Sequence, residues 1–377
     1  MAMSTGLCAV ELFAGAGGLS IGLERAGFSV VMANEIEKDF AASFSMNHPN
    51  ALMLNRDIHE IDFAYEAAQC GHTDITLVSG GPPCQGFSTV GSKNRKDPRN
   101  SLFYEYLRAV AELNPSYVIF ENVLGFKKMY DGEAFNILTR ELKYLGYDFV
   151  SSILEASDYG LPQKRQRTII VGWKAHLNPV LLPLPTHTAT PDFSGGSPKR
   201  SLMDALSDLP PIEANDSASG YAALPLNDYQ QKMRGDESVL TEHNSSNYGE
   251  KMKEILSLIP QGGTVDDLPF RLRPKSYFGN TYARLLPDVP SPTITRNFGT
   301  PSSSRCVHPF QNRALSTREG ARLQGFHDSY RLCGSKISKN LQIGNAVPPI
   351  FGEVIAAEIV KSITSKTWPR VRSTTGL

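Results

Sequence analysis

Short apolar stretches alternate with amphipathic segments through the first half of the chain. The apolar stretches have the length of strands and lie at residues 8–13, 30–33, 74–79, 117–120, 148–154 and 168–172. Helices are expected between them, at about residues 19–26, 102–113 and 133–145. Because strands that alternate with helices form parallel sheets covered on both faces, the pattern predicts an α/β fold with a doubly wound, mostly parallel sheet.

The second half has a different texture. Residues 183–196 are rich in proline, glycine, serine and threonine, which is typical of a linker. Residues 186–325 lack the rhythm of the first half, so we expect a smaller, irregular domain there. Beyond it, Pro348 and Pro349 open an apolar helix, and Asn345 is placed to cap it.

Charge is balanced over the whole chain but not along it. The 377 residues hold 38 Lys and Arg against 38 Asp and Glu, so there is no global basic field for a polyanion. The segment 271–322 has only Asp288 and Glu319 as acids. Its basic residues are Arg271, Arg273, Lys275, Arg284, Arg296, Arg305, Arg313, Arg318 and Arg322. This local excess predicts a surface that contacts nucleic acid.

Cysteine usage and the N-terminus indicate a reducing compartment. The cysteines at 8, 70, 84, 306 and 333 are widely spaced, without a CxxC pair or a histidine spacing suited to zinc. We therefore expect free thiols and no structural metal. The first residues lack a signal sequence, and no apolar run approaches the roughly 20 residues of a spanning helix. A cytoplasmic protein that does not engage a membrane is expected.

One cysteine stands just after a predicted strand, in the sequence GGPPCQGFS of residues 80–88. Open α/β sheets bind ligands at the carboxyl ends of their strands, and glycines and prolines here would shape a stiff turn that a ligand can approach. Cys84 is therefore a candidate nucleophile, although a lone cysteine is more often a small buried hydrophobe. Glu121 ends the next predicted strand and would share a crevice with Cys84; without Cys84, a structural ion pair would be the preferred interpretation.

Two arginines precede the last predicted strand of the first half. Arg165 and Arg167 are two positions apart on an extended segment, so their guanidinium groups would point to the same face. Together they could form a fork for a carbonyl, carboxylate or phosphate group. The alternative is a solvated basic edge.

A glycine-rich turn, AGAGG at residues 14–18, follows the first strand. Such a turn leaves amide N–H groups beside a ligand, and Glu35 after the second strand could accept both ribose hydroxyls of a nucleotide-like cofactor. A nicotinamide dinucleotide would require glycine where this chain has Ser20, whereas S-adenosylmethionine has no pyrophosphate and does not. Asp57 could accept from an adenine amino group or cap a short helix.

Taken together, these motifs resemble those of bacterial DNA (cytosine-5)-methyltransferases, in the family's order from about residue 7 to residue 362. FAGAGG at 13–18 resembles the cofactor loop, PCQ at 83–85 the nucleophile motif, and ENV at 121–123 and QKRQR at 163–167 the next two motifs. Residues 313–326 and QIGNAVPP at 342–349 resemble the last two conserved blocks. The resemblance implies a methyltransferase of Rossmann-like fold that uses S-adenosyl-L-methionine.

The resemblance also implies roles for the catalytic motifs. Cys84 would add to carbon 6 of a cytosine flipped out of double-stranded DNA, and Glu121 would hydrogen-bond or protonate ring nitrogen 3. Arg167, with Arg165, would hold the cytosine O2 and the catalytic loop. The implied cofactor site consists of Phe13, Gly15, Gly17, Gly18, Leu19, Glu35, Ile36, Asp57, Ile58, Pro83, Leu102, Asn345 and Ala346.

In the same comparison, residues 186–325 would form the target-recognition domain. The C-terminal helix would return to complete a catalytic domain of residues 1–185 and 326–377. We expect a monomer that protects DNA in a restriction-modification system, or a solitary relative, with any cognate endonuclease acting separately.

Several residues are predicted to contact DNA. Thr293 and Ile294 resemble the family's Thr-Leu dipeptide near the path of the flipped base. Arg284 and Arg296 are predicted to read guanines by bidentate contacts, with phosphate contacts as the alternative. The remaining predicted DNA contacts are Gln85 and Ser88.

Three other functions share parts of this pattern. A methyltransferase of the same fold could act on tRNA, although the long variable region favours DNA. A DNA-binding regulator without catalysis is disfavoured by the intact Cys84, Glu121 and Arg167, and a nicotinamide oxidoreductase is disfavoured by Ser20. No motif specifies the recognition sequence or the cytosine that is modified within it.

Overall fold

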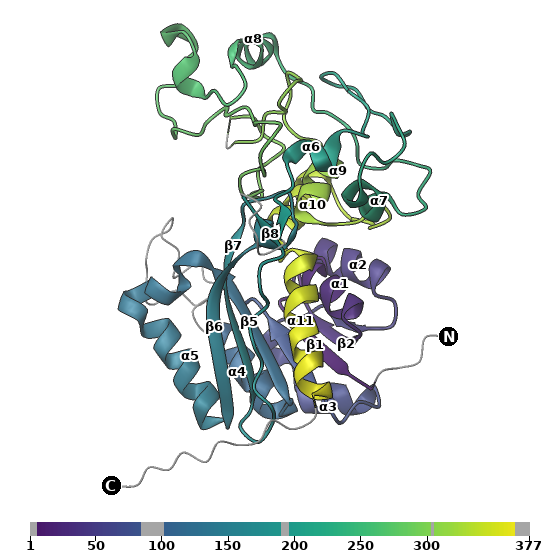
Figure 1. The fold of residues 1–377 in the computed structure, drawn as a ribbon, viewed down its shortest axis with the longest axis vertical. Coiled ribbons are helices and arrows are strands. Elements are labelled where there is room, and N and C mark those ends of the chain that lie inside the picture. Colours follow the sequence, from purple (N-terminus) through teal and green to yellow (C-terminus); the bar gives the residue numbers. More distant parts are fainter. Residues whose placement is uncertain (1–5, 84–101, 190–195, 303–304, 366–377) are drawn as a thin grey trace.

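The computed structural model describes residues 6–83, 102–189, 196–302 and 305–365. The chain has two parts (Figure 1): a lower part built on a sheet, and an upper part with few regular elements. The C-terminal helix, in yellow, lies against the sheet beside the purple N-terminal elements. The two ends of the sequence therefore build the lower part together.

Within the described residues, the lower part holds a seven-stranded sheet in the order β3-β2-β1-β4-β5-β7-β6. The strands are β1 (Cys8–Leu12), β2 (Ser29–Asn34), β3 (Leu52–Leu54), β4 (Leu77–Gly80), β5 (Tyr117–Val123), β6 (Tyr147–Glu155) and β7 (Gln166–Lys174). β1 to β5 form parallel pairs, and β7 is antiparallel to both β5 and β6. The prediction of a mostly parallel sheet is confirmed.

Helices cover both faces of this sheet. They are α1 (Gly18–Arg25), α2 (Lys38–Asn47), α3 (Phe63–Gln69), α4 (Leu102–Leu113), α5 (Glu133–Tyr144) and α11 (Pro349–Thr364). The first layer contains α3, α4 and α5, and the second contains α1, α2 and α11. The sheet is therefore doubly wound, as predicted.

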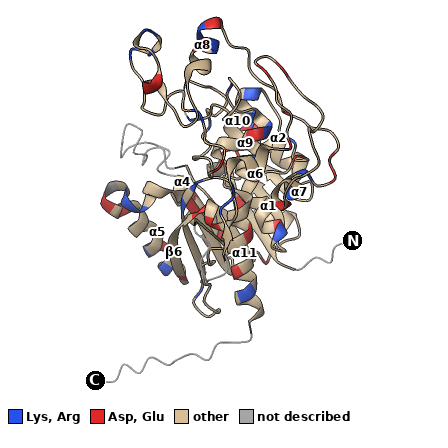
Figure 2. Cartoon of the chain, turned by 45° about the horizontal axis from the view of Figure 1, so that its top comes forward, with Lys and Arg blue, Asp and Glu red and all other residues tan. Residues whose placement is uncertain are grey.

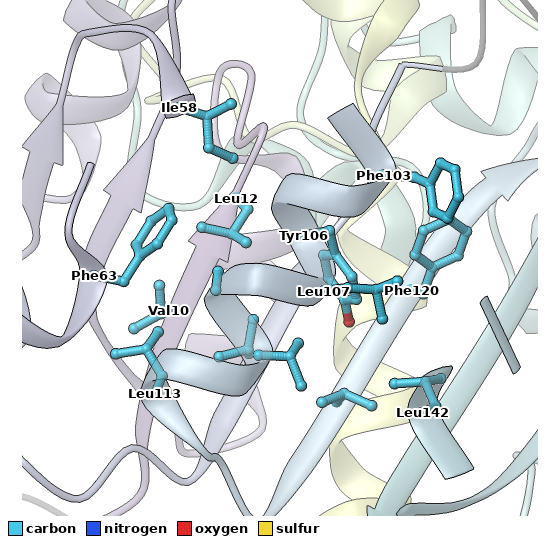
Figure 3. Packing of buried hydrophobic residues seen from close by; sticks show 14 of the residues in the cluster. Val10, Leu12, Ile58, Phe63, Phe103, Tyr106, Leu107, Leu113, Phe120 and Leu142 are labelled. Atoms are coloured by element: carbon cyan, nitrogen blue, oxygen red, sulfur yellow. The ribbon is translucent and has the colours of Figure 1, made fainter. Parts of the chain in front are cut away.

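Residues along each strand alternate between the two layers, because successive side chains of a strand point to opposite faces. On β5, Val118 and Phe120 join the first layer, while Tyr117 and Ile119 join the second. Figure 3 shows the first layer, where Tyr106 of α4 meets Phe120 edge to face with ring centroids 5.3 Å apart. Burial on both faces explains why the central strands are mostly apolar.

α1 and α11 approach each other closely across two glycines. A Cβ atom on Gly22 would lie 2.1 Å from the carbonyl oxygen of Pro349, and one on Gly352 would lie 2.5 Å from that of Leu19.

By length and composition, Lys336–Thr364 is the one stretch of the described residues that could cross a membrane. However, 56% of its most apolar window is buried inside the protein, as in a core helix.

The start of α11 agrees with one prediction and corrects another. Pro349 is the first residue of the helix, where its fixed φ and missing N–H suit the first turn. Asn345 does not cap this helix, because it is the last residue of the preceding α10 (Lys336–Asn345). Pro348 takes the capping position instead, without a side-chain hydrogen bond.

The upper part contains short helices joined by long irregular segments. Its helices are α6 (Leu202–Leu206), α7 (Asp228–Arg234), α8 (Glu250–Leu258), α9 (Thr317–Gln324) and α10. The short strands β8 (His187–Thr188) and β9 (Ser197–Pro198) lie near its base, and five 3₁₀ segments, Ile58–Glu60, Leu124–Gly132, Ala156–Tyr159, Val265–Asp267 and Phe270–Leu272, occur along the described chain.

One buried cluster unites much of the upper part. It takes in Leu202 of α6 and Leu323 of α9, and also Phe326, Tyr330 and Ile343 from the segment predicted to belong to the catalytic domain. That segment therefore packs with the upper part before α11 returns to the sheet. The domain boundary at residue 326 stays a prediction.

Candidate active site

A cavity of about 620 Å³ opens at the carboxyl ends of β1, β2, β4 and β5, where the fold is expected to bind ligands. Most of the predicted cofactor residues line it: Phe13, Gly15, Leu19, Glu35, Ile36, Asp57, Ile58, Pro83, Leu102, Asn345 and Ala346. Glu121, Arg165 and Arg167 line it as well. The structure thus brings predicted cofactor and catalytic residues from distant parts of the chain into one site.

The glycine-rich turn after β1 forms one wall of the cavity. Phe13 (φ +55°), Gly15 (φ +58°) and Gly17 (φ +84°) all adopt left-handed backbone conformations. Both carboxylate oxygens of Glu35 bind main-chain N–H groups, that of Gly15 at 2.8 Å and that of Glu37 at 2.9 Å. Burial raises the pKa of Glu35, although these N–H donors oppose the shift.

Gly17 and Gly18, two of the predicted cofactor residues, do not line the cavity. A Cβ atom on Gly18 would lie 2.3 Å from the carbonyl oxygen of Val347, and one on Gly17 would lie 2.6 Å from Nε2 of His48. Both positions require glycine because other parts of the chain approach them. The sequence pattern alone does not distinguish this from approach by a ligand.

Asp57 has the capping role predicted for it, and its contact with an adenine stays a prediction. It caps the 3₁₀ turn Ile58–Glu60, where its carboxylate accepts from the main-chain N–H of His59 at 3.0 Å. That hydrogen bond lowers the pKa of Asp57. Asp57 also lines the cavity, so a carboxylate with a lowered pKa faces this space.

Glu121 lies at the end of β5, next to the residues that follow β4. Its side chain is buried, and Oε1 lies 2.7 Å from Nε of Arg167. A Cβ atom on Gly81 would be 2.7 Å from Oε2 of Glu121, so the glycine allows the carboxylate to approach. The pairing of β4 with β5 was predicted to bring Cys84 beside Glu121, but Cys84, with Gln85 and Ser88, lies outside the described residues.

Burial has the largest effect on the Glu121 carboxyl and raises its pKa. Arg167 and then Arg165 act in the opposite direction. A carboxyl group whose pKa is raised by burial and lowered by two arginines is suited to hydrogen-bonding or protonating a ring nitrogen.

Arg165 and Arg167 both line the cavity but do not form one fork. Nη1 of Arg165 donates to the carbonyl of Ile294 (3.0 Å), and Nη2 donates to the carbonyls of Gly344 (3.1 Å) and Ala346 (2.8 Å). The buried Nε of Arg165 has no partner among the described residues. Arg165 therefore joins three chain segments, and its buried Nε–H is still available for a further acceptor.

Glu11 lines the cavity although the motif analysis did not single it out. It is a buried acid within the apolar strand β1, and that mismatch is the signal that could have revealed it. Ser20 donates its hydroxyl to the Glu11 carboxyl, which gives a structural reason for serine where a dinucleotide fold would have glycine. Burial raises the pKa of Glu11 to about 8, with the Ser20 hydrogen bond opposing the shift.

This raised pKa predicts a pH-dependent stability of the ligand-free protein. Stabilisation by the retained proton is fully present below about pH 4.5, the ordinary pKa, and is lost as the pH rises through about 8. Glu11→Gln, which stays neutral, should therefore gain stability relative to the wild type between pH 5 and pH 8. Urea unfolding of both proteins across this range measures the difference; a constant difference would contradict the prediction.

Thr293 and Ile294 lie against the QKRQR segment. The main-chain N–H of Ile294 donates to Oε1 of Gln163 at 2.9 Å, and its carbonyl accepts from Arg165. Thr293 donates its hydroxyl to the carbonyl of Lys164 at 2.7 Å. The Ile294 side chain is buried in the upper core, so the prediction that it contacts DNA is wrong. For the partly exposed Thr293, DNA contact stays a prediction.

Arg284 is also unavailable to DNA. Its guanidinium is buried and donates to the carbonyls of Leu256, Ile259, His308 and Gln311 and to Oδ1 of Asn312. These five acceptors match the five N–H groups of arginine, so no donor is left for a guanine. Arg284 holds the irregular part together instead. Arg296 is exposed, and its predicted base contact remains a prediction.

The burial of several arginines also corrects the prediction that segment 271–322 forms a basic surface. Arg313, Arg318 and Arg322 are at most 1% exposed, and Arg313 and Arg322 bind Glu319, Asp208 and Asp328 inside the protein. With Arg284, four of the nine basic residues of segment 271–322 therefore cannot contribute to a surface. Figure 2 shows basic and acidic residues interspersed over the upper part rather than a uniform basic face.

The fold and the site define a class of protein: an α/β enzyme with a nucleotide-type cavity at the switch in strand order and a buried Glu–Arg pair beside it. Comparison with known proteins makes the class specific. Residues 7–361 match the family model described as C-5 cytosine-specific DNA methylase. The chain belongs to this family of DNA methyltransferases.

Individual relatives agree with this assignment. Type II methyltransferase M.DdeI from Desulfomicrobium norvegicum is 34% identical, over 93% of this chain and 88% of the relative. Type II methyltransferase M1.HphI from Haemophilus parahaemolyticus is 32% identical, over 95% of this chain and 87% of the relative.

Solved structures share the fold. A candidate DNA modification methyltransferase encoded within an Escherichia coli prophage superimposes with a TM-score of 0.76 at 27% identity, covering 95% of this chain and all (100%) of that one. The Dnmt2 methyltransferase of S. pombe gives a TM-score of 0.57 at 18% identity, covering 94% of this chain and 98% of that one. At that identity the second comparison supports the fold alone.

Proposed function

We propose that the protein transfers a methyl group from S-adenosyl-L-methionine to carbon 5 of a cytosine in a specific double-stranded DNA sequence. The observation that carries this proposal is the placement of the Glu121–Arg167 pair in the same cavity as the glycine-rich turn and Glu35. A base and a cofactor bound in one cavity would be in position to react with each other.

The cavity residues fit the proposed cofactor. Glu35 ends β2 with a carboxylate beside the Gly15 amide, as required to hold ribose hydroxyls, and the exposed Ile36 offers an apolar surface for an adenine ring. Asp57 offers an ionised acceptor farther along the wall. When bound, S-adenosylmethionine supplies an electrophilic methyl group; the protein's own residues must activate the cytosine.

That activation requires a nucleophile, because carbon 5 of cytosine is weakly nucleophilic. In the proposed reaction, the Cys84 thiolate adds to carbon 6 while Glu121 hydrogen-bonds or protonates nitrogen 3 and stabilises the electrons displaced onto the ring. Carbon 5 then takes the methyl group and loses its proton, and elimination restores the thiolate of Cys84. Arg167 holds Glu121 and faces the same cavity, where it is placed to bind the cytosine O2.

The target base must leave the duplex to reach this cavity, because it cannot react while stacked. α10 of the upper part contributes Gly344 and Asn345 to the cavity wall, and Thr293 binds the Lys164 carbonyl where the two parts meet, so we assign target recognition to the upper part. Arg296 is the exposed arginine nearest this junction in sequence and is proposed to contact DNA there.

The biological setting is part of the proposal. Relatives named as Type II methyltransferases support protection of DNA in a restriction-modification system, with any endonuclease acting separately on the same DNA. Action as a monomer in the cytoplasm fits the cysteines, since Cys8, Cys70, Cys306 and Cys333 are free thiols within the described residues.

The proposal is tested by bisulfite sequencing of plasmid DNA from cells that express the protein, with Cys84→Ala as the control. We expect methylation at one short motif, absent in the control because the nucleophile is missing. Transfer of labelled methyl groups to DNA and tRNA in parallel addresses the RNA alternative. Methylation of tRNA alone, or of neither nucleic acid, would overturn the proposal.

A further inference from the structure

The glycine-rich turn is held from behind, on the side away from the cavity. The hydroxyl of Tyr330 donates to the carbonyl of Ala16, in the middle of the turn. Ala14 and Gly15 line the cavity, whereas Ala16 does not. The turn therefore lies between the site and a buried tyrosine that takes no part in the proposed chemistry.

A histidine and a glutamate orient that tyrosine. Nε2 of His48 lies 3.2 Å from the Tyr330 hydroxyl, and Nδ1 lies 2.9 Å from Oε1 of Glu24. His48 is 3% exposed, so both ring nitrogens depend on these partners rather than on water. Glu24, His48 and Tyr330 form a chain of hydrogen bonds that ends on Ala16.

This arrangement accounts for Gly17. A Cβ atom there would lie 2.6 Å from Nε2 of His48 and 2.8 Å from the Tyr330 hydroxyl. The glycine thus admits the two side chains to the back of the turn. The contact with His48 and Tyr330 is by itself a sufficient reason for glycine at this position of the motif.

The turn needs such support because its backbone is strained. Phe13 has a φ of +55°, which is costly for an aromatic residue, and surrounding contacts must maintain it. Glu35 holds the turn from the cavity side through the Gly15 amide, and Tyr330 holds it from the opposite side through Ala16. Loss of either contact would remove one of the bonds that hold the turn in this conformation.

Tyr330 itself is fixed by the upper part. It belongs to the upper buried cluster, and its ring lies 4.9 Å from that of Phe326 between centroids. The upper part therefore contributes a side chain to the shape of a turn in the lower part.

We propose that Tyr330, oriented by His48 and Glu24, is a positioning residue that sets the affinity for S-adenosylmethionine by holding the Ala16 carbonyl. This inference rests on the proposed function, since it concerns the same cofactor. Tyr330 does not line the cavity and acts through the turn.

The test is Tyr330→Phe, with Tyr229→Phe as the matched control. Tyr229 is buried in the same cluster, and its hydroxyl also donates to a main-chain carbonyl, that of Arg322, but it has no contact with the turn. Titration calorimetry gives the Kd for S-adenosylhomocysteine, and steady-state assays give KM for S-adenosylmethionine and kcat.

We expect Kd and KM to rise about tenfold in Tyr330→Phe, the loss equivalent to one buried hydrogen bond, with kcat at saturating cofactor within about twofold of the wild type. Tyr229→Phe should match the wild type in all three. If Tyr330→Phe does not fold, His48→Ala, which keeps the hydroxyl on Ala16 but removes its orienting partner, should raise Kd in the same direction.

Two results would overturn the inference. The first is an unchanged Kd in Tyr330→Phe, or in His48→Ala if Tyr330→Phe does not fold. The second is an equal rise of Kd in Tyr229→Phe. Either result, with a wild type that binds cofactor and methylates DNA, leaves the proposed function intact. A wild type that binds neither S-adenosylmethionine nor S-adenosylhomocysteine overturns both.

Discussion

Glu121→Gln is expected to lower kcat by about 10²- to 10⁴-fold, the usual loss when a general acid is removed. Glutamine keeps the size of the side chain but cannot give a proton to the cytosine ring. It also ends the charge pairing with Arg167, whose Nε lies 2.7 Å from Oε1 in the wild type. The loss is expected in kcat rather than in cofactor affinity, because the interaction gains strength only as the thiolate adds.

The measurement is transfer of labelled methyl groups to plasmid DNA, together with the Kd for S-adenosylhomocysteine. Glu112→Gln is the matched control, since Glu112 also pairs with an arginine, Arg108 at 2.6 Å, but does not line the cavity. The control should keep its activity. A Glu121→Gln enzyme within tenfold of the wild type would show that Glu121 is only a structural ion-pair partner.

Arg322→Met is expected to destabilise the protein by about 3–5 kcal/mol, the typical loss when one member of a buried ion pair is removed. The Arg322 side chain is completely buried between the carboxylates of Asp208 and Asp328. In the variant, Asp328 still accepts the hydrogen bond from the Tyr221 hydroxyl and lies near Arg318. Asp208 loses the charged partner that offsets its burial. Methionine fills a similar length without a charge.

Urea unfolding measures this loss, and the triple variant Arg322→Met/Asp208→Asn/Asp328→Asn should recover part of it by removing the unpaired charges. Arg271→Met is the matched control, because its exposed pair with Glu254 should leave the unfolding midpoint unchanged. If Arg322→Met unfolds at the wild-type midpoint, the buried ion pairs of Arg322 with Asp208 and Asp328 do not stabilise the upper part.

The sequence predicted the sheet and the position of the strand-end carboxylates well because both depend on local pattern. Glu35 and Glu121 could be assigned to one edge of the sheet, since parallel strands end together, and the structure places both in one cavity. Gly17 shows the limit of such reasoning. A small residue indicates that something approaches closely, but only the fold shows that the approaching groups are His48 and Tyr330.

The arginines of the irregular part were predicted least well. Nothing near Arg322 in sequence shows that Asp208, more than a hundred positions away, will meet it in the core. Arg284 likewise is neutralised by no nearby acid but is satisfied by carbonyl groups, which every residue carries. Counting charges along a segment therefore overstated the basic surface, because burial of arginine depends on contacts that no local pattern encodes.

The way Ile294 is held has a consequence for how far the sequence of the upper part can vary. Gln163 and Arg165 bind this position by its main-chain N–H and carbonyl, and neither bond depends on which side chain it carries. Neighbouring residues can therefore be substituted without loss of this attachment. A connection made through the peptide backbone keeps the two parts joined while the sequence of the upper part changes.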